Sequence, residues 1–308
     1  MTALPDTAVL TLDHLATWSH EGMALAVLGH PIMHSLSPAM HNAALAGMSA
    51  RNRDYAAWRY FRFDIPPENL PEALPRLHAA GFHGLNLTVP HKVLAFDLVE
   101  EIDDSAKRIG AVNTLRRTAT GWRGFNTDGY GLAAALRADL GVSLTNACVI
   151  LLGAGGAARA AAVECVQQLC AELWIGNRTA ATRQALLDEL VGGRINCQGF
   201  DPAQLPADLP ENAIVINATS LGLKADDPAP IALRRLPPGA KVYDMIYNPP
   251  QTALLCEAAT LGLPHANGLS MLVHQGAKSL EIWTGESAQA TAPVMQAAAA
   301  AALAASSS

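Results

Sequence analysis

The chain has 308 residues, of which 50% are hydrophobic and only 16% are charged, so it can bury the cores of two ordinary domains and is not a disordered chain. Its formal net charge is −6 and it carries no long basic block, which makes nucleic acid an unexpected partner. The first twenty residues lack a basic start and a clean apolar run. We therefore expect no signal peptide, no membrane-spanning helix and a cytoplasmic protein.

The first part of the chain alternates between strand and helix patterns, which predicts a largely parallel sheet. The expected elements are a strand and turn at 24–32, a helix from 37, a strand at 60–65, a helix at 66–81, a strand at 84–89, and a helix followed by a strand within 102–115. Ser37 is a candidate N-cap of its helix, and Pro38 suits the first helical position.

A second α/β pattern begins near residue 147, where an apolar strand runs into a glycine-rich turn and a helix. Further strands are expected at 172–179, 213–220 and 241–248, and a last helix follows Gly268. The alanine-rich tail, 296–308, favours helix and is given no chemistry. We expect two α/β domains, 1–127 with 269–308 and 128–268, with ligands beyond the carboxyl ends of the strands.

The five cysteines form no C-x-x-C pair. We therefore interpret them as buried small side chains in a reducing compartment, and we expect no metal site.

The glycine-rich turn resembles a dinucleotide fingerprint, in which backbone N–H groups approach a pyrophosphate. Gly153, Gly155, Gly156 and Ala157 form it, and it lies between a strand and a helix as the fingerprint requires. A plain strand–helix turn is the alternative.

The next strand ends in Asn177, Arg178 and Thr179, with no acid to hold ribose hydroxyls. An arginine there suits a phosphate and so predicts NADP rather than NAD. The alternative for Arg178 is a solvated surface arginine.

Polar side chains also gather at element ends in the first domain. The stretch 86–92, NLTVPHK, ends a strand with an amide, a hydroxyl and an ammonium group. Ser35 with Ser37, Asn113 and Asp128 occupy similar places. Each has a structural alternative, because Ser37 or Asp128 can cap a helix and Asn113 can satisfy a turn.

Taken in order, the motifs resemble those of the shikimate dehydrogenases. They are GHPIMHSLSPAMHNAAL, GLNLTVPHK, IGAVNTL, GFNTDGYGL, LLGAGGAARA, INATSLG, YDMIYNPPQT and GLSMLVHQGA, and they extend from about residue 24 to 285. The resemblance implies a substrate domain with a mixed or parallel sheet, a Rossmann domain, and a last helix that returns to the first domain.

The resemblance also implies roles for individual residues. Lys92 would be the catalytic group and Asp128 its partner. The remaining substrate-binding residues would be Ser35 and Ser37 for a carboxylate, Asn86, Thr88, Asn113 and Gln275 for hydroxyls, and Tyr247 in the pocket lining. The cofactor-binding residues would be Gly153, Gly155, Gly156, Ala157, Asn177, Arg178, Thr179, Thr219, Gly268 and Met271. The family often has a second basic residue shortly after NRT, where this chain has Thr182, with Arg183 one position later.

We therefore expect an enzyme of aromatic amino-acid biosynthesis, a monomer or homodimer, that reduces 3-dehydroshikimate to shikimate reversibly with NADPH. The alternatives are a quinate/shikimate dehydrogenase using NAD or NADP, a catalytically silent ligand sensor, and a dehydrogenase that shares only the Rossmann half. His34, His41 and His91 are not expected to be catalysts. His91 should face away from Lys92 if the chain stays extended there.

Overall fold

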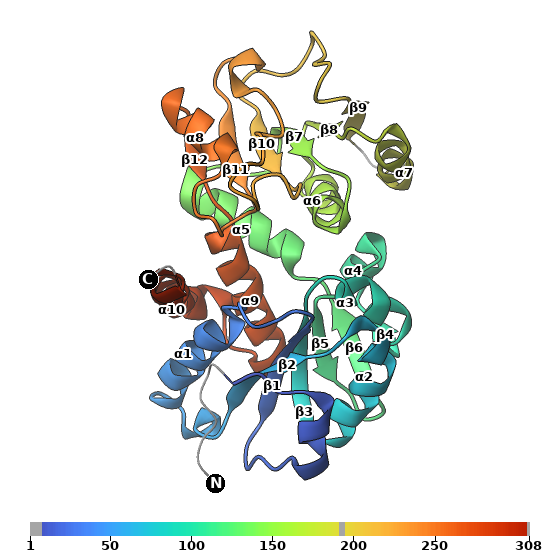
Figure 1. Cartoon of the computed structure of the whole chain (residues 1–308), viewed down its shortest axis with the longest axis vertical. Helices are drawn as coiled ribbons and strands as arrows, with labels where there is room; N and C mark the ends of the chain where they lie inside the picture. The colour runs from blue at the N-terminus through green and yellow to red at the C-terminus, as the bar shows by residue number, and fades with distance from the viewer. Residues whose placement is uncertain (1–7, 191–194, 307–308) are drawn as a thin grey trace. The chain divides into compact units, whose positions relative to one another are not determined.

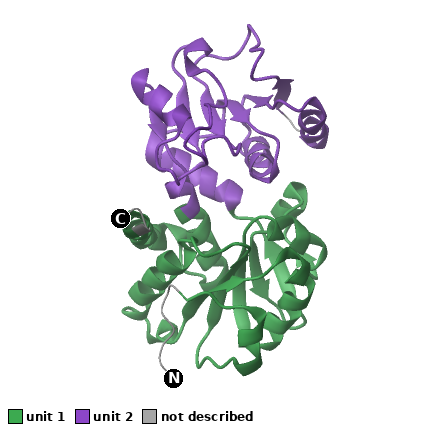
Figure 2. Ribbon diagram, viewed as in Figure 1, with its two compact units in different colours: residues 1–127, 273–308 green, residues 128–272 purple. Residues whose placement is uncertain are grey.

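The computed structural model describes residues 8–190 and 195–306, which form two compact units (Figure 2). The first unit comprises 1–127 and 273–308, and the second comprises 128–272. Each has its own six-stranded sheet (Figure 1). The alanine-rich tail, for which a helix is expected, includes residues 307 and 308, which lie outside the described residues.

The sheet of the first unit is mixed. Its order is β2-β1-β3-β5-β6-β4, with β1 Ala24–Gly29, β2 Arg59–Asp64, β3 Phe82–Leu87, β4 Glu101–Ile102, β5 Thr114–Arg117 and β6 Trp122–Phe125. Strands β1, β2 and β3 are parallel, as expected, whereas β5 pairs antiparallel with both β3 and β6. The β5–β6 link is too short for a crossover, so these two strands can pair only as a hairpin.

Alternation along β3 separates the core from the polar face. Leu85 and Leu87 pack in one apolar cluster with Leu74 and Leu77 of helix α2, while Asn86 points to the opposite face. The helical segments of this part are η1 Leu12–Thr17, α1 Ser37–Ser49, η2 Arg53–Tyr55, η3 Pro67–Asn69, α2 Leu70–Ala79, α3 His91–Leu94, η4 Ala95–Asp97 and α4 Asp104–Ile109.

Two of the expected local features are wrong. Ser37 is the first residue of α1 rather than its cap, because Leu36 already has helical dihedrals and takes the N-cap position. The Oγ of Ser35 accepts from the backbone N–H of Ser37 (3.3 Å). The chain also does not stay extended through His91, because α3 begins there as a short helical turn.

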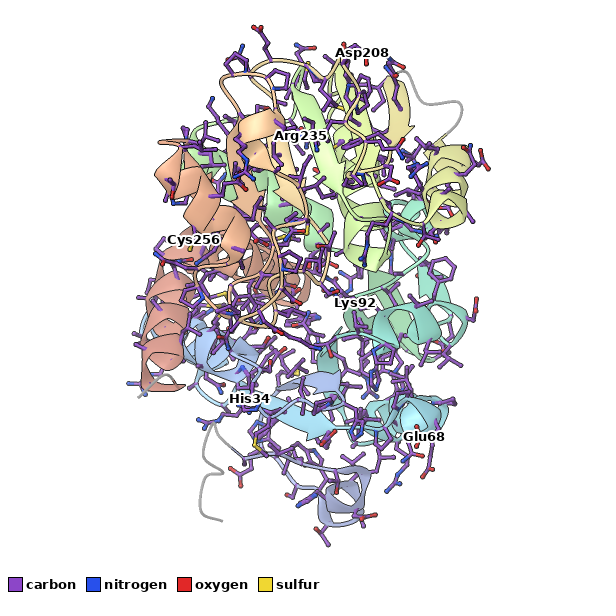
Figure 3. The ribbon with its side chains drawn as sticks, turned by 45° about the horizontal axis from the view of Figure 1, so that its top comes forward. His34, Glu68, Lys92, Asp208, Arg235 and Cys256 are labelled. Carbon is purple, nitrogen blue, oxygen red and sulfur yellow. The ribbon has the colours of Figure 1, made fainter. Side chains whose placement is uncertain are left out.

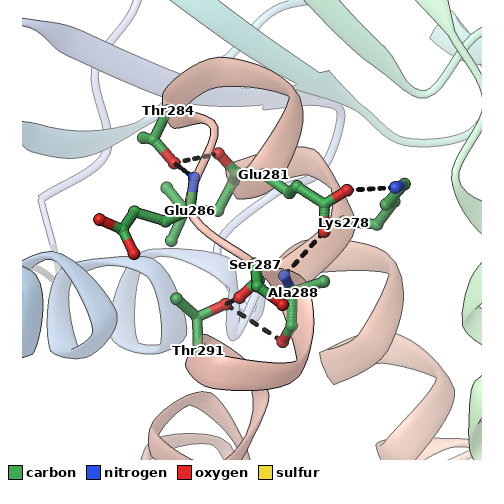
Figure 4. Close-up of polar contacts among 8 residues, drawn as sticks. Lys278, Glu281, Thr284, Glu286, Ser287, Ala288 and Thr291 are labelled. Carbon is green, nitrogen blue, oxygen red and sulfur yellow. Dashed lines mark hydrogen bonds and ion pairs between the residues drawn. The ribbon is translucent and has the colours of Figure 1, made fainter.

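The last two helices belong largely to the first unit, as predicted. Helix α9 (Leu269–Thr284) is tied to β5 by Trp283, whose Nε1 donates to the carbonyl of Leu115 (2.9 Å). Helix α10 (Ala288–Ser306), which contains residues 296–306 of the alanine-rich tail, packs along α1. At their junction Glu281 accepts from Lys278 and from the backbone N–H of Ala288 (Figure 4).

The sheet of the second unit is wholly parallel, as its apolar strands predict. Its order is β12-β11-β10-β7-β8-β9, with β7 Cys148–Leu152, β8 Glu172–Gly176, β9 Asn196–Phe200, β10 Ile214–Asn217, β11 Lys241–Asp244 and β12 His265–Ala266. Its helices are α5 Asp128–Leu140, α6 Gly156–Gln167, α7 Ala180–Leu190, η5 Leu233–Arg235 and α8 Ala253–Thr260. The strand order reverses between β7 and β10, so a ligand is expected beyond their carboxyl ends.

The cysteine expectation is only partly right. Cys165 and Cys170 are buried, but Cys148 and Cys197 are half-buried and Cys256 is exposed. Residues 8–190 and 195–306 contain no cluster of side chains suited to a metal ion. Over the same residues no helix is both long and apolar enough to cross a membrane.

Candidate active site

Asn113 is the hub of a buried polar cluster in the first unit. It is 1% exposed, and its Oδ1 accepts from the backbone N–H of Thr127 (2.9 Å) and the hydroxyl of Thr114 (2.9 Å). Its own backbone carbonyl accepts from the N–H of Leu87 (2.9 Å). One residue therefore ties β3 to the segment that leads into α5.

Asn86 links this hub to a second group of hydroxyls. Its Nδ2 donates to the carbonyl of Asn113 (3.1 Å), and its Oδ1 accepts from the phenol of Tyr60 (2.8 Å). Tyr60 is also hydrogen-bonded by the side chain of Ser37, and burial raises its pKa well above the ordinary value. Because the phenol stays protonated, it can donate to Asn86 at every physiological pH.

Helix α9 contributes Gln275 and Ser279, which share one helix face four residues apart. Ser279 is fully buried, and its Oγ lies 2.7 Å from the Thr114 hydroxyl and accepts from Asn86 Nδ2 at 3.0 Å. The Oε1 of Gln275 accepts a longer bond from Asn113 Nδ2 (3.4 Å). The helix that returns to this unit thus completes the cluster.

Sequence reasoning missed four members of this cluster: Tyr60, Thr114, Thr127 and Ser279. Three of them had a usable signal. Ser279 lies one helical turn beyond Gln275. Thr114 directly follows the predicted site residue Asn113, and Thr127 directly precedes Asp128. Tyr60 had none, because an aromatic residue in a strand reads as ordinary core.

Lys92 lies in the short turn α3 and is labelled in Figure 3. Its backbone N–H donates to the carbonyl of Thr88 (3.2 Å), and its own carbonyl accepts from the N–H of Val112 (2.8 Å). The residue next to the Asn113 hub therefore fixes the backbone of Lys92. Thr88 itself sits close to Gly29, where a Cβ would lie 2.3 Å from its Oγ1, so the glycine leaves room for the hydroxyl.

Asp128 starts α5 and is 9% exposed. It directly follows Thr127, which is held by Asn113 through both its N–H (2.9 Å) and its hydroxyl (3.0 Å). The same hub that fixes the backbone of Lys92 through Val112 therefore fixes the chain position just before Asp128.

The histidines near this cluster have structural surroundings. His91 is buried, and its Nε2 donates to the carbonyl of Ile65 (2.7 Å), while burial lowers its pKa. His41 stacks on Tyr60 with ring centroids 4.1 Å apart, and complete burial lowers its pKa from 6.5 to about 3. A histidine held neutral in this way packs against the tyrosine that orders Asn86.

The second unit contains a cavity of about 510 Å³ at the carboxyl ends of β7, β8 and β10. Its lining comprises Leu152, Gly153, Ala154, Gly155, Gly176, Asn177, Arg178, Pro202, Ala203, Ala218, Thr219, Ser220, Leu221, Pro228, Ala229, Pro230, Ile231, Ala232 and Arg235. This is the crevice that the reversal of strand order predicts.

The glycines of the turn differ in what requires them. Gly153 has φ +112°, and a Cβ there would lie 2.9 Å from the carbonyl oxygen of Ala218, so the fold itself requires a glycine. A Cβ on Gly155 or Gly156 would meet no protein atom within 4 Å. The protein leaves open space at these two positions, where α6 begins without a side-chain cap, and the N-terminus of a helix is a place where phosphate groups commonly bind.

A buried carboxylate helps to order the loop after β10. Asp244 accepts from Thr252 (2.6 Å) and from the Nδ2 of Asn217 (2.9 Å), and burial raises its pKa. The Oδ1 of Asn217 in turn accepts from the hydroxyl (2.7 Å) and the N–H (3.0 Å) of Thr219. These bonds fix the loop after β10 that carries Thr219 into the cavity lining.

The segment after β8 contributes Asn177 and Arg178 to the cavity lining. Asn177 Nδ2 donates to the carbonyl of Thr179 (3.0 Å), which holds the loop. Arg183 donates to the backbone carbonyls of Asn177 and Phe200 and is not part of the lining. A second lining arginine, Arg235, comes from the distant η5 segment and was missed by sequence reasoning.

Several predicted residues do not line this cavity, namely Gly156, Ala157, Thr179, Gly268 and Met271. Gly268 has a packing reason, because a Cβ there would lie 2.0 Å from the carbonyl oxygen of Met245. The N–H of Met271 donates to the phenol of Tyr243 (3.2 Å). Tyr247 belongs to the second unit, where it is partly buried, and burial raises its pKa.

The parallel sheet, the glycine turn and the crevice at the strand reversal define the second unit as a dinucleotide-binding unit of the Rossmann type. Comparison with known families then identifies the family to which the chain belongs. Residues 27–115 match the shikimate dehydrogenase substrate binding domain, 135–224 match shikimate / quinate 5-dehydrogenase, and 268–299 match the shikimate 5'-dehydrogenase C-terminal domain. The chain belongs to the shikimate dehydrogenase family, which confirms the resemblance of its motifs.

Individual relatives agree with this assignment. The shikimate dehydrogenase (NADP(+)) of Methanopyrus kandleri is 38% identical over 87% of this chain and 92% of its own length. The shikimate 5-dehydrogenase of Thermus thermophilus, crystallised with NADP(H) and shikimate, has a TM-score of 0.78 at 35% identity, over 91% of this chain and 99% of that one. A 5-ketofructose reductase of Gluconobacter also has the fold, with a TM-score of 0.79 at 31% identity, over 90% of this chain and 99% of that one.

Proposed function

We propose that this protein catalyses the reversible, NADP-dependent reduction of 3-dehydroshikimate to shikimate, a step in aromatic amino-acid biosynthesis. The relatives named above support the reaction and the cofactor. The observation within the chain that carries the proposal is the Asn113 hub. Through Val112 and Thr127 it fixes the backbone at Lys92 and the residue before Asp128, the two side chains suited to proton transfer.

When bound, NADPH supplies the hydride, and the protein must supply a proton to the carbonyl oxygen. The Lys92 ammonium would donate that proton during reduction, and the amine would take it back in the reverse direction. The Asp128 carboxylate would orient the lysine and balance its charge. A positioned acid–base pair of this kind contributes about 10²–10⁴-fold in rate.

The remaining residues of the cluster would hold a small polyhydroxylated ring. Hydroxyl and amide groups of Thr88, Asn113 and Gln275 suit the ring hydroxyls, and Ser35 with Ser37 suits the carboxylate. Asn86 would also face a ring hydroxyl, and its bonds to Asn113, Thr114, Ser279 and Tyr60 would keep these neighbours in place. Tyr247 would line the substrate pocket.

We expect shikimate to be favoured over quinate. Quinate has an additional hydroxyl beside its carboxylate, and this group needs room and a partner near Ser35 and Ser37. A ligand group left unpaired in a polar site is rejected strongly.

The test is a comparison of kcat/KM for the purified protein across substrates and cofactors. Shikimate and quinate are assayed in the direction of oxidation and 5-ketofructose in the direction of reduction, each with the NADP and the NAD form. The proposal predicts the highest value for shikimate with NADP. A quinate value equal to or above that for shikimate, or faster turnover of 5-ketofructose, would overturn the substrate assignment.

A further inference from the structure

The cavity of the second unit has an uncompensated positive charge. Among the residues that the structure describes, its lining includes two ionisable side chains, Arg178 and Arg235, and no carboxylate. The two arginines come from separate segments, one just after β8 and the other from η5, between β10 and β11. Both are exposed, and neither side chain has a hydrogen bond or ion pair within residues 8–190 and 195–306. Two guanidinium groups at one cavity repel each other until an anion is bound.

The basic residue nearest to Arg178 in sequence does not contribute to this charge. Arg183 donates to the carbonyls of Asn177 and Phe200, and a Cβ on Gly199 would lie only 2.9 Å from its Cδ. From helix α7, its guanidinium therefore bridges the carboxyl ends of β8 and β9. The second positive charge at the cavity is that of Arg235 instead.

The ligand that fits two such groups is a phosphate monoester. Such a group carries a charge of about −2 near neutral pH and three acceptor oxygens, whereas one guanidinium neutralises only one charge. The adenosine of NADP differs from that of NAD by one phosphate monoester at the ribose 2′ position. The segment that carries Arg178 is the one that meets this ribose in dinucleotide-binding units.

We propose that Arg235 is a second ligand of the cofactor's 2′-phosphate, acting together with Arg178, and so contributes to the preference for NADP. This inference rests on the proposed function, since it assumes that the cavity holds the adenosine end of NADP. The neighbouring Arg234 provides a matched control. It is also exposed and belongs to the same short segment, but it does not line the cavity, and its backbone N–H donates to Glu257 (3.4 Å).

The experiment measures equilibrium binding rather than turnover. The dissociation constants of 2′,5′-ADP and 5′-AMP, which differ only by the 2′-phosphate, are determined by calorimetry for the wild type, Arg235→Ala, Arg235→Lys and Arg234→Ala. Loss of one charge-assisted contact should weaken 2′,5′-ADP binding to Arg235→Ala about tenfold and leave 5′-AMP within about twofold. Arg235→Lys should recover part of the loss, and Arg234→Ala should behave as the wild type.

Three results would overturn the proposal. Unchanged binding of 2′,5′-ADP to Arg235→Ala would show that Arg235 does not contact the 2′-phosphate. An equal loss for both nucleotides would place Arg235 at the adenine or the 5′-phosphate instead. A wild type that binds both nucleotides equally would overturn this proposal and the NADP assignment together. If the binding results hold but shikimate is not oxidised, only the substrate part of the proposed function fails.

Discussion

The two units of this protein prepare their sites by different physical means. In the first unit, buried side chains bond one another, so that Asn86, Asn113 and Ser279 are almost completely enclosed. In the second unit, backbone N–H groups, glycines and exposed arginines border an open cavity of about 510 Å³. A closed network fixes atoms to a fraction of an ångström, as proton transfer to one oxygen requires. An open, charged cavity selects a ligand by its charge and tolerates adjustment.

This contrast predicts which substitutions act on turnover and which act on ligand preference. Lys92→Ala should have the largest effect and lower kcat by about 10²–10⁴-fold, with a much smaller change in the KM for shikimate. Lys107→Ala, which removes an exposed lysine paired with Asp104, is the control and should retain wild-type rates. Near-normal kcat in a folded Lys92→Ala variant would show that Lys92 does not take part in proton transfer.

Arg178→Ala should have the next largest effect, and it should act on preference instead of chemistry. Loss of one or two charge-assisted hydrogen bonds of roughly 1.5–3 kcal/mol each reduces the preference for NADP over NAD by about tenfold to a hundredfold. The kcat/KM with NAD serves as the internal control and should change little. A large NADP preference that survives the substitution would show that Arg178 is a solvated surface arginine.

Ser279→Ala tests whether the closed network also stabilises the first unit. The substitution removes the hydrogen bonds of the Ser279 hydroxyl with Asn86 Nδ2 and with the Thr114 hydroxyl, each worth about 0.5–1.5 kcal/mol in the free energy of unfolding. Ser270→Ala, on the same helix but bonded to Asp139 near solvent, should cost less than about 0.5 kcal/mol. Equal losses in chemical denaturation of the two variants would argue against a network.

The smallest expected effect is a pH dependence that belongs to the first unit. His41 has a folded-state pKa of about 3 against 6.5 when unfolded, so the unfolded chain binds the proton first as the pH falls. Its contribution to stability is complete above pH 6.5 and is lost progressively down to about pH 3. Between about pH 6.5 and 5.5 the free energy of unfolding should fall by about 1 kcal/mol on this account.

Chemical denaturation of His41→Phe at several pH values measures this contribution. The variant should lose that part of the slope, whereas His265→Gln, which removes an exposed histidine, should keep it. A wild-type slope that is unchanged in His41→Phe would show that His41 is not the group responsible.

The sequence predicted more of the second unit's fold than of the first unit's. Apolar β-branched runs such as 149–152 indicate a buried parallel strand directly, and the glycine turn marks where the ligand lies. The β5–β6 hairpin and the short turn at His91 were missed, because strand direction and a single helical turn depend on tertiary pairing.

The site residues show the same limit. The motifs singled out Lys92, Asp128 and Asn113 as candidates, since each stands at an element end with a polar side chain. Tyr60 and Arg235 were missed because each reaches its site from a segment far away in sequence, more than 25 residues from Asn86 in one case and more than 50 from Arg178 in the other. Only the folded chain brings such residues to the groups they serve.

The most direct test of this division between the units is a double-mutant cycle of Lys92→Ala and Arg178→Ala, followed by the ratio of kcat/KM with NADP to that with NAD. We expect Lys92→Ala to lower both values equally, and the double variant to lose the same NADP preference as Arg178→Ala alone. The coupling energy should then stay within about 0.5 kcal/mol. A ratio that changes in Lys92→Ala, or a clearly larger coupling energy, would contradict the separation of chemistry from cofactor choice.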